Sequence, residues 1–212
     1  MIEQILFDFD GVIIDSMDVR DFGFREIFKS YDAALVEEFI QYHRYNAGLS
    51  RYVKIRHFYE VMLGESIATE KVNNLAENFS LIMKERLVDP AIIIQETLDF
   101  IKSIYHDIPL HIVSGSDEKE LNFLCDALNL SRYFVTIEGS PTPKNELVKD
   151  IMVKYNYTPK TTILIGDSIN DYDAAKMNGL YFVGFNNTDL MVKSDLYVDV
   201  VDKKTLEFPY AD

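Results

Sequence analysis

Residues 4–12 read Gln-Ile-Leu-Phe-Asp-Phe-Asp-Gly-Val, an apolar run that leads directly into two acidic residues. Alternation along a β-strand places Asp8 and Asp10 on one side of the chain and Phe9 on the other. Two carboxylates on one side of a strand end repel each other, which costs stability unless a cation or a proton compensates. The stretch therefore predicts a buried strand whose carboxyl end carries an acidic functional site.

Further apolar runs alternate with helical patterns in the second half of the chain, as βαβ units require. The run at residues 162–165 is apolar almost throughout, which is typical of a parallel strand covered on both faces. The spacing predicts a doubly wound, Rossmann-like α/β fold built on a parallel sheet. Strands are expected at residues 2–9, 109–113, 134–137, 162–165, 180–185 and 196–201, and helices at residues 118–128 and 145–155.

The interval between the first two expected strands is far longer than a βαβ crossover needs. It shows no clear strand pattern but does show helical periodicity, with Thr69 as an expected N-cap. We therefore expect a helical cap subdomain at residues 16–87, inserted into an α/β core formed by residues 1–15 and 88–212. The hinges are expected near residues 15–16 and 89–90.

Composition and charge argue against several classes of protein. The net charge of −14 disfavours a general nucleic-acid binder, because phosphate backbones attract clustered Lys and Arg, but it is compatible with divalent cations. The single cysteine, Cys125, leaves no internal disulfide framework or thiolate zinc cluster. The sequence has no apolar run long enough to span a bilayer and no signal-peptide pattern at its start. We expect a cytoplasmic protein, as a monomer or homodimer.

A second acidic group follows the expected strand at residues 162–165. The segment reads Gly-Asp-Ser-Ile-Asn-Asp and ends at Asp171, with Asp167 directly after the glycine. In an open α/β sheet, ligands bind outside the carboxyl ends of the strands. Two acidic clusters at two such ends would form an oxygen-rich site suited to Mg²⁺.

Two further elements suggest an anion site at the same edge of the sheet. Ser114, Gly115 and Ser116 follow the expected strand at residues 109–113, and they offer hydroxyl and backbone N–H groups before a helix. Lys144 begins another expected helix and is placed to neutralise a phosphate or the carboxylates. Each element alone is weak evidence, but all four in this order are hard to explain as structure only.

Taken together, these groups resemble the four motifs of the haloacid dehalogenase-like (HAD) superfamily of phosphohydrolases. The resemblance spans the whole expected core. The helical insertion lies where β-phosphoglucomutase-like and phosphoglycolate phosphatase-like members carry their caps, between the first and second motifs. The matching segments are Asp8-Phe-Asp-Gly-Val12, Ser114-Gly-Ser116, Lys144 and Gly166-Asp-Ser-Ile-Asn-Asp171.

The resemblance implies roles for the acidic residues. Asp8 is similar to the nucleophile that forms an aspartyl-phosphate, and Asp10 to the general acid that protonates the leaving oxygen and then activates water. The Asp8 carboxylate, the Asp10 backbone carbonyl and Asp167 look like the Mg²⁺ ligands. Asp171 resembles a further acidic residue of the metal site that acts through water. The acid at position 10 separates the chain from the dehalogenase and phosphonate-cleaving branches, so phosphoryl transfer is the expected reaction.

The resemblance also implies that Ser114 and the Gly115 N–H hold the phosphate while Lys144 stabilises its charge. Many capped relatives carry this lysine just before a Pro-Ala-Pro-Asp stretch, where the present chain has Ser140. Lys144 comes four residues later. Either Lys144 reaches the same point from the helix start, or the basic residue is absent; we favour the first alternative.

Residues 41–59 contain several basic residues and no acid. This pattern fits a solvated helix face that neutralises nearby carboxylates, and it also fits a cap surface that binds an anionic substrate. The acidic surroundings disfavour nucleic-acid binding. Residues 46–51 resemble the cap loop of β-phosphoglucomutase-like members, where a Gly-x-Ser-Arg segment touches the non-transferring end of the substrate. Gly48, Ser50 and Arg51 are thus expected substrate contacts, with Arg51 clamping an anion.

The sequence therefore predicts a Mg²⁺-dependent phosphatase that hydrolyses a small phosphorylated metabolite through an aspartyl-phosphate. A sugar phosphate or a phosphoglycolate-like compound is the expected substrate. A carboxylate nucleophile divides a very slow hydrolysis into two easier steps. One alternative is a phosphosugar mutase of the β-phosphoglucomutase type, in which a sugar hydroxyl attacks the aspartyl-phosphate. The other is a non-catalytic phosphometabolite-binding protein, against which the complete acidic set argues.

Overall fold

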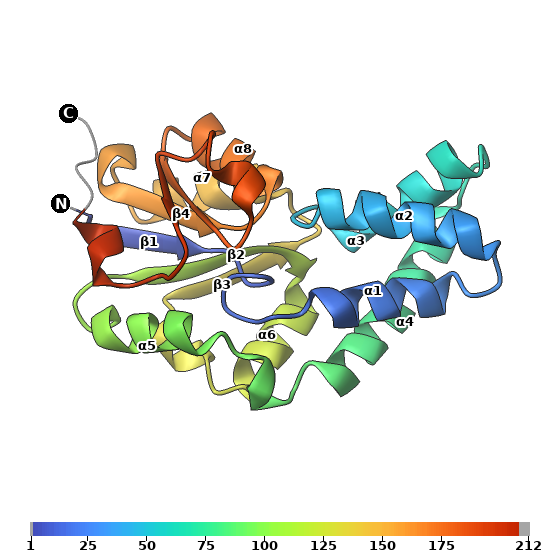
Figure 1. Cartoon of the computed structure of the whole chain (residues 1–212), viewed down its shortest axis with the longest axis horizontal. Coiled ribbons are helices and arrows are strands. Elements are labelled where there is room, and N and C mark those ends of the chain that lie inside the picture. The colour runs from blue at the N-terminus through green and yellow to red at the C-terminus, as the bar shows by residue number, and fades with distance from the viewer. Residues whose placement is uncertain (1, 208–212) are drawn as a thin grey trace.

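The computed structural model describes residues 2–207. They form a parallel sheet with the strand order β3-β2-β1-β4-β5-β6, which confirms the predicted doubly wound α/β fold (Figure 1). Each strand overlaps one of the predicted apolar runs. The strands are β1 (Gln4–Phe7), β2 (Leu110–Asp117), β3 (Thr136–Ser140), β4 (Thr162–Gly166), β5 (Tyr181–Phe185) and β6 (Leu196–Val198).

Helices cover both faces of the sheet, with α5 and α6 on one face and α7 and α8 on the other (Figure 1). Alternate residues of β1 therefore enter different layers: Ile5 and Phe7 join one apolar cluster and Leu6 joins the other. This two-sided burial explains why the central strands are almost continuously apolar. The covering helices are α5 (Gln95–Ile104), α6 (Glu118–Ala127), α7 (Lys144–Lys154) and α8 (Ile169–Met177).

Residues 17–86, between β1 and α5, form a helical insertion that lies beyond the carboxyl ends of the strands (Figure 1). Its core is aromatic, and the stacked rings of Phe28 and Phe58 have centroids 4.0 Å apart. Such rings bury a large apolar area per residue, which a small helical unit needs for stability. The helices are α1 (Met17–Ile27), α2 (Ala33–Tyr45), α3 (Arg51–His57) and α4 (Thr69–Arg86), and a π-helical turn at Phe58–Met62 follows α3.

The predicted N-cap of α4 is wrong by one residue. The helix begins at Thr69 itself, and the N-cap is Ala68, which makes no side-chain capping bond. The Thr69 hydroxyl instead accepts a hydrogen bond of 2.9 Å from the Arg56 guanidinium. The prediction fails because Arg56 comes from α3, and a one-dimensional pattern does not place it beside the start of α4.

Two short segments connect the helical insertion to the sheet, and they are bonded to each other. The Asp15 N–H donates to the Ile92 carbonyl at 2.8 Å, and the Ile94 N–H donates to the Ile13 carbonyl at 3.0 Å. The hinge positions expected from the sequence lie in or beside this pair of segments. Movement of the insertion about them remains a prediction.

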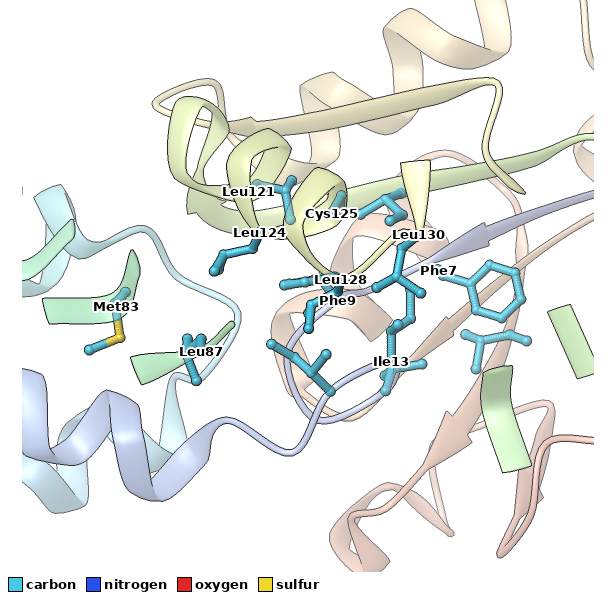
Figure 2. Packing of buried hydrophobic residues seen from close by; sticks show 14 of the residues in the cluster. Phe7, Phe9, Ile13, Met83, Leu87, Leu121, Leu124, Cys125, Leu128 and Leu130 are labelled. Carbon is cyan, nitrogen blue, oxygen red and sulfur yellow. The ribbon is translucent and has the colours of Figure 1, made fainter. Parts of the chain in front are cut away.

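One apolar cluster runs from the sheet into the helical insertion (Figure 2). Met83 and Leu87, at the end of the insertion, belong to the same buried cluster as Leu121 and Leu124 of α6. This contact holds α4 against α6 and so fixes the side of the sheet on which the insertion is attached.

Short 3₁₀ turns complete the described chain. They lie at Pro90–Ile92, Ser131–Tyr133, Pro159–Thr161, Thr188–Leu190 and Lys203–Leu206. Within residues 2–207, none of the helices has both the length and the apolar character needed to cross a membrane.

Candidate active site

The neighbouring strands β1 and β4 both end at an acidic residue. Asp8 directly follows β1 and Asp167 directly follows β4. The chain leaves β1 towards β2 on one side, whereas β4 pairs with β1 on the other side, so the strand order reverses here. Such a reversal opens a crevice at the carboxyl edge of a parallel sheet, which is where ligands bind in this class of fold.

Lys144, the first residue of α7, reaches this crevice. Its ammonium nitrogen lies 2.9 Å from Asp8 Oδ1 and also bonds to Asp171 Oδ1. The Asp8 side chain additionally accepts a hydrogen bond of 2.7 Å from the Phe9 N–H. The geometry agrees with the favoured alternative that Lys144 reaches the site from the helix start; its action on phosphate remains a prediction.

The start of α8 orients Asp171. Ser168 is the N-cap of α8, and its hydroxyl and backbone N–H donate to Asp171 Oδ2 at 2.5 and 3.0 Å. This reciprocal capping arrangement satisfies backbone donors at the helix start. It also leaves Asp171 Oδ1 facing Lys144, so one side chain caps a helix and positions the lysine.

Asp8, Asp167 and Asp171 each offer a carboxylate oxygen within 4.8 Å of the others. Among the described residues, Asp167 Oδ1 is buried without a hydrogen-bond partner. A side chain at Gly11, whose φ is +75°, would meet Asp167 Oδ2 at 2.0 Å, so a glycine is required here. Closely spaced oxygen donors, one of them unsatisfied, fit a hard cation such as Mg²⁺. These three side chains could hold it, and the predicted contribution of the Asp10 backbone carbonyl remains a prediction.

The crowded carboxylates resist ionisation. Burial and then the negative charge of Asp171 raise the pKa of Asp8 from 3.8 to about 7. Burial and then the charge of Asp8 raise the pKa of Asp167 well above its ordinary value. For Lys144, burial opposes the charged form, but Asp171 and Asp8 outweigh it and raise the pKa. The site therefore needs either protons or a cation to become stable.

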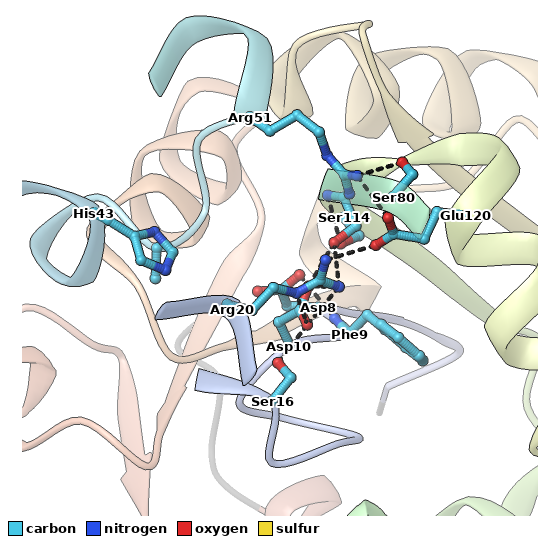
Figure 3. A network of polar contacts seen from close by, with 12 residues as sticks. Asp8, Phe9, Asp10, Ser16, Arg20, His43, Arg51, Ser80, Ser114 and Glu120 are labelled. Atoms are coloured by element: carbon cyan, nitrogen blue, oxygen red, sulfur yellow. Dashed lines mark hydrogen bonds and ion pairs between the residues drawn. The ribbon is translucent and has the colours of Figure 1, made fainter. Parts of the chain in front are cut away.

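Asp10 lines the same cavity as Asp8, and its hydrogen-bond partners come from α1, the segment before it and β2 (Figure 3). Arg20 of α1 donates to both of its oxygens, at 3.0 and 3.1 Å. The Ser116 and Ser16 hydroxyls donate to it at 2.6 and 2.5 Å. Burial acts to raise the pKa of Asp10, but Arg20 and these hydroxyls outweigh it and hold the pKa below its ordinary value. In this arrangement the Asp10 carboxylate is held in its ionised form.

The strand that contains Gly115 is longer than expected. β2 continues through Ser114 and Ser116 to Asp117 because its end still pairs with Ser140 of β3, after a register shift beyond Val113. The predicted end of this strand at residue 113 is thus wrong, and the binding of phosphate by Ser114 and the Gly115 N–H remains a prediction. Ser114 stays buried, and its hydroxyl accepts a hydrogen bond of 3.1 Å from the Ser116 N–H.

Gly48 and Gly115 bring the helical insertion into close contact with the sheet. A Cβ atom at Gly115 would meet the Gly48 carbonyl oxygen at 2.3 Å, and one at Gly48 would meet Ser168 Oγ at 2.6 Å. Both glycines therefore allow the insertion to approach the core closely, and the contact of Gly48 with substrate remains a prediction. Ser50 serves as the N-cap of α3, and its hydroxyl accepts a hydrogen bond of 3.4 Å from the Val53 N–H.

Basic side chains from the helical insertion line the cavity that contains Asp8 and Asp10. Arg20, Arg51, Lys54 and His43 all line it and are all buried. The Lys54 ammonium donates to the Ala47 carbonyl at 2.9 Å, and burial lowers its pKa to about 7. Burial likewise lowers the pKa of His43 well below its ordinary value. The interpretation of residues 41–59 as a solvated helix face is therefore wrong for His43, Arg51 and Lys54, which are buried.

Arg51 is not free to bind a substrate anion in this structure. Its guanidinium lies 2.5 Å from Glu120 Oε2 of α6 and donates to the Ser80 hydroxyl at 2.5 Å (Figure 3). Arg20 contacts the other oxygen of Glu120 at 2.6 Å. The contact of Arg51 with substrate remains a prediction. An anionic substrate would have to compete with the Glu120 carboxylate for the Arg51 guanidinium.

Sequence reasoning missed Arg20, Ser16 and Glu120 as residues of the site, and it missed the bond from Ser116 to Asp10. A signal existed for Arg20, since it follows Ser16 by four residues, the spacing that puts two side chains on one face of a helix start. Glu120 carried none, because a glutamate in the first turn of a helix is ordinarily explained by the helix dipole.

Replacing Lys144 with Met should show how far the site depends on its charge. We expect kcat for phosphate release to fall about 10²–10³-fold, because a donor aimed at developing negative charge is lost. The unfolding free energy should fall by about 3 kcal/mol at pH ~8, because Asp8 and Asp171 stay buried without their cation. Lys149→Met, at an exposed position of the same helix, is the matched control. Unchanged kcat in Lys144→Met would remove the lysine from the reaction.

Comparison with known proteins agrees with this geometry. The phosphorylated carbohydrates phosphatase of Thermotoga maritima is 25% identical over 189 residues, which cover 84% of this chain and 82% of that protein. The β-phosphoglucomutase of Clostridium difficile superposes with a TM-score of 0.80 at 20% identity, covering 99% of this chain and 97% of that chain. CbbY from Rhodobacter sphaeroides, solved with phosphate, gives 0.77 at 18% identity, covering 98% and 100%. Residues 5–185 match the family described as haloacid dehalogenase-like hydrolase, and this protein therefore belongs to that family.

Proposed function

We propose that the protein is a Mg²⁺-dependent phosphatase that hydrolyses a small phosphorylated metabolite, such as a sugar phosphate or a phosphoglycolate-like compound, through an aspartyl-phosphate (an acyl phosphate) on Asp8. The observation that carries the proposal is the position of Asp8: its carboxylate is buried at a strand end, in contact with Lys144 and beside Asp167 and Asp171. The phosphatase name of the Thermotoga maritima relative supports the same reaction class.

The proposed reaction has two steps. An Asp8 oxygen attacks phosphorus, and the bond from phosphorus to the leaving oxygen breaks as that oxygen takes a proton. Water then attacks the aspartyl-phosphate, gives up a proton and releases phosphate and free Asp8. Asp10 is the proposed carrier of both protons, because it lines the cavity with Asp8. Asp10 is ionised at the start, so it takes up a proton from solvent as the substrate binds, gives that proton to the leaving oxygen in the first step, and accepts one from the attacking water in the second.

The remaining groups act on the transferring phosphate. Lys144 neutralises part of its charge, and Ser114 with the Gly115 N–H is placed to hold its oxygens. Mg²⁺ bound by Asp8 and Asp167, with Asp171 alongside, would supply further charge stabilisation on those oxygens. Each of these groups favours the transition state more than the ground state, because negative charge gathers there during transfer.

We further propose that residues 16–87 act as a cap that opens to admit substrate and closes for reaction. The supporting observations are that the helical insertion roofs the cavity and that it is attached through the paired segments around Asp15 and Ile93. Closure over the site would exclude bulk water and so strengthen the electrostatic interactions inside.

A panel of phosphate esters with Mg²⁺ tests the proposal. Phosphate release and product identity are measured for sugar phosphates, including both anomers of glucose 1-phosphate, and for phosphoglycolate, nucleotides and an aryl phosphate. Preferential release of free phosphate from a small metabolite is expected. An isomerised sugar phosphate with little free phosphate would replace the phosphatase by a mutase. Silence on the panel, together with no labelling of Asp8 by acetyl phosphate, would favour a binding protein.

A further inference from the structure

Glu120 lies in the α/β core, but its carboxylate contacts side chains of the helical insertion. It lies in the first turn of α6 and is fully buried. One oxygen contacts Arg20 of α1 at 2.6 Å and the other contacts Arg51 of α3 at 2.5 Å (Figure 3). A carboxylate held between two guanidinium groups is the arrangement that proteins use to bind an anionic ligand group.

The local structure of α6 does not require this carboxylate. The helix is capped by Asp117, whose side chain accepts hydrogen bonds from the Lys119 and Glu120 N–H groups at 3.1 and 3.2 Å. The Glu120 side chain is therefore available for another purpose. Burial acts to raise its pKa, but Arg20 and Arg51 outweigh that effect and hold the pKa below its ordinary value, so the group is charged at neutral pH.

The two arginines face the reaction cavity. Arg20 and Arg51 both line it, together with Asp8 and Asp10. Without Glu120, the charge of Arg51 would be unpaired and that of Arg20 would be shared only with Asp10, so both guanidinium groups would attract a second anionic group on the substrate. Glu120 is not among the residues that line the cavity, but it contacts both guanidinium groups and already neutralises their charge. Asp117, which accepts a hydrogen bond of 2.8 Å from the Tyr52 hydroxyl, adds another acidic side chain to the same contact between α6 and the insertion.

We propose that Glu120 is a built-in counter-anion that makes this enzyme select phosphate monoesters of uncharged alcohols and sugars and reject substrates with a second phosphate or a carboxylate. The inference rests on the proposed phosphatase function and narrows its substrate class from the two named above to the sugar phosphates. A second anionic group must either displace Glu120, which leaves a buried carboxylate unpaired, or lie beside a like charge.

The pairing of Arg20 and Arg51 with Glu120 also disfavours the mutase alternative. A mutase that uses an aspartyl-phosphate passes through a bisphosphate, because the attacking hydroxyl belongs to a sugar that already carries one phosphate. The site must then hold two phosphate groups at once. Arg20 and Arg51 are already paired with Glu120, and Arg20 also with Asp10, so we expect the site to hold a second phosphate poorly.

Matched substrate pairs test the role of Glu120. The pairs are fructose 6-phosphate with fructose 1,6-bisphosphate, and 2-hydroxyethyl phosphate with 2-phosphoglycolate; the members of each pair differ in one anionic group. For the wild type we expect kcat/KM to favour the uncharged member by about tenfold or more. Glu120→Gln should reduce that preference about tenfold, mainly through a lower KM for the anionic member. Glu118→Gln, at an exposed position in the same helical turn, should leave the ratio unchanged.

Two outcomes would overturn the proposal: a wild-type preference for the anionic members, or equal changes in both members of a pair in Glu120→Gln, which a purely structural ion pair would give. If Glu120→Gln does not fold, Glu120→Asp can replace it. The shorter side chain keeps the charge but holds it farther from Arg20 and Arg51, so the preference for the uncharged substrate should again fall. Binding of the fructose pair by calorimetry, in an Asp8→Asn background with and without Glu120→Gln, reads the same selectivity without turnover. Failure of the phosphatase proposal is distinct: the wild type would release no phosphate from any ester, whatever the binding ratio.

Discussion

Asp8→Asn is expected to abolish phosphate release while leaving the protein folded. Only the carboxylate oxygen of Asp8 can form the aspartyl-phosphate, and the amide that replaces it is not a nucleophile. A loss of about 10⁴-fold or more in kcat is expected for a residue in this role. The substitution keeps the shape of the side chain, so the amide would still fit between Lys144 and the Phe9 N–H. Phosphate release and circular dichroism on the same sample check both halves of this expectation.

The stability of Asp8→Asn should depend on pH in a direction set by the raised pKa. Asp8 has a pKa of about 7 in the fold, against 3.8 ordinarily. Between these values the native state holds a proton that the unfolded state has lost, so wild-type stability falls as pH rises through this window. The Asn variant carries no such cost. With chelator present, it should be more stable than the wild type by about 4 kcal/mol at pH ~8 and nearly equal at pH ~4.

Denaturant unfolding at these two pH values measures the difference. Asp150→Asn, at an exposed position of α7, is the matched control and should show no such trend. Retained turnover in Asp8→Asn would remove Asp8 as the nucleophile. A variant less stable than the wild type at both pH values would instead mean that the Lys144 ion pair outweighs the crowding of the carboxylates.

The sheet could be predicted because burial on both faces leaves a direct trace in the sequence. Strand β4 is apolar almost throughout, and β1 is followed at once by acidic residues that would be costly inside a strand. The strand order then brings Asp8 and Asp167 together without further assumptions, because the carboxyl ends of parallel neighbours share an edge. Much of the acidic site therefore follows from local patterns plus topology.

The contacts of the helical insertion could not be predicted in the same way. Arg51 and Glu120 are far apart in the sequence, and each has an ordinary local explanation, as a basic residue in a helix and as an acid in a first turn. Only the packing of α3 and α1 against α6 brings their charges together. The role of Thr69 could not be predicted for the same reason, because its hydroxyl accepts a hydrogen bond from Arg56 of another helix and does not cap its own helix.

Mg²⁺ is expected to raise the melting temperature, and to do so more strongly at higher pH. Cation binding requires ionised carboxylates, and burial with mutual repulsion raises the pKa of Asp8 to about 7 and that of Asp167 well above its ordinary value. As pH rises these groups lose their protons, the repulsion grows, and a cation gains both ligands and a larger repulsion to relieve. The Mg²⁺-dependent shift should therefore be small at pH ~5.5 and large at pH ~8.

The size of that shift follows from mass action. A cation at about 100 times its Kd stabilises the folded state by about 3 kcal/mol. For a chain of this length, that corresponds to roughly 5–10 °C in Tm. Melting curves with Mg²⁺ and with chelator, at both pH values, measure it, and chelator should reverse it fully.

Asp167→Asn distinguishes Mg²⁺ binding at this site from a general screening of the protein's negative charge by Mg²⁺. Asp167 Oδ1, which has no hydrogen-bond partner within residues 2–207, gives up its charge in this variant, so the Mg²⁺ shift should disappear. Asp173→Asn, at an exposed position of α8, should keep the full shift. If both variants responded to Mg²⁺ like the wild type, the cation would be acting on the net charge of −14 and not at the strand ends. A shift lost only in Asp167→Asn would place the cation between β1 and β4, beside the carboxylate that the proposed reaction uses.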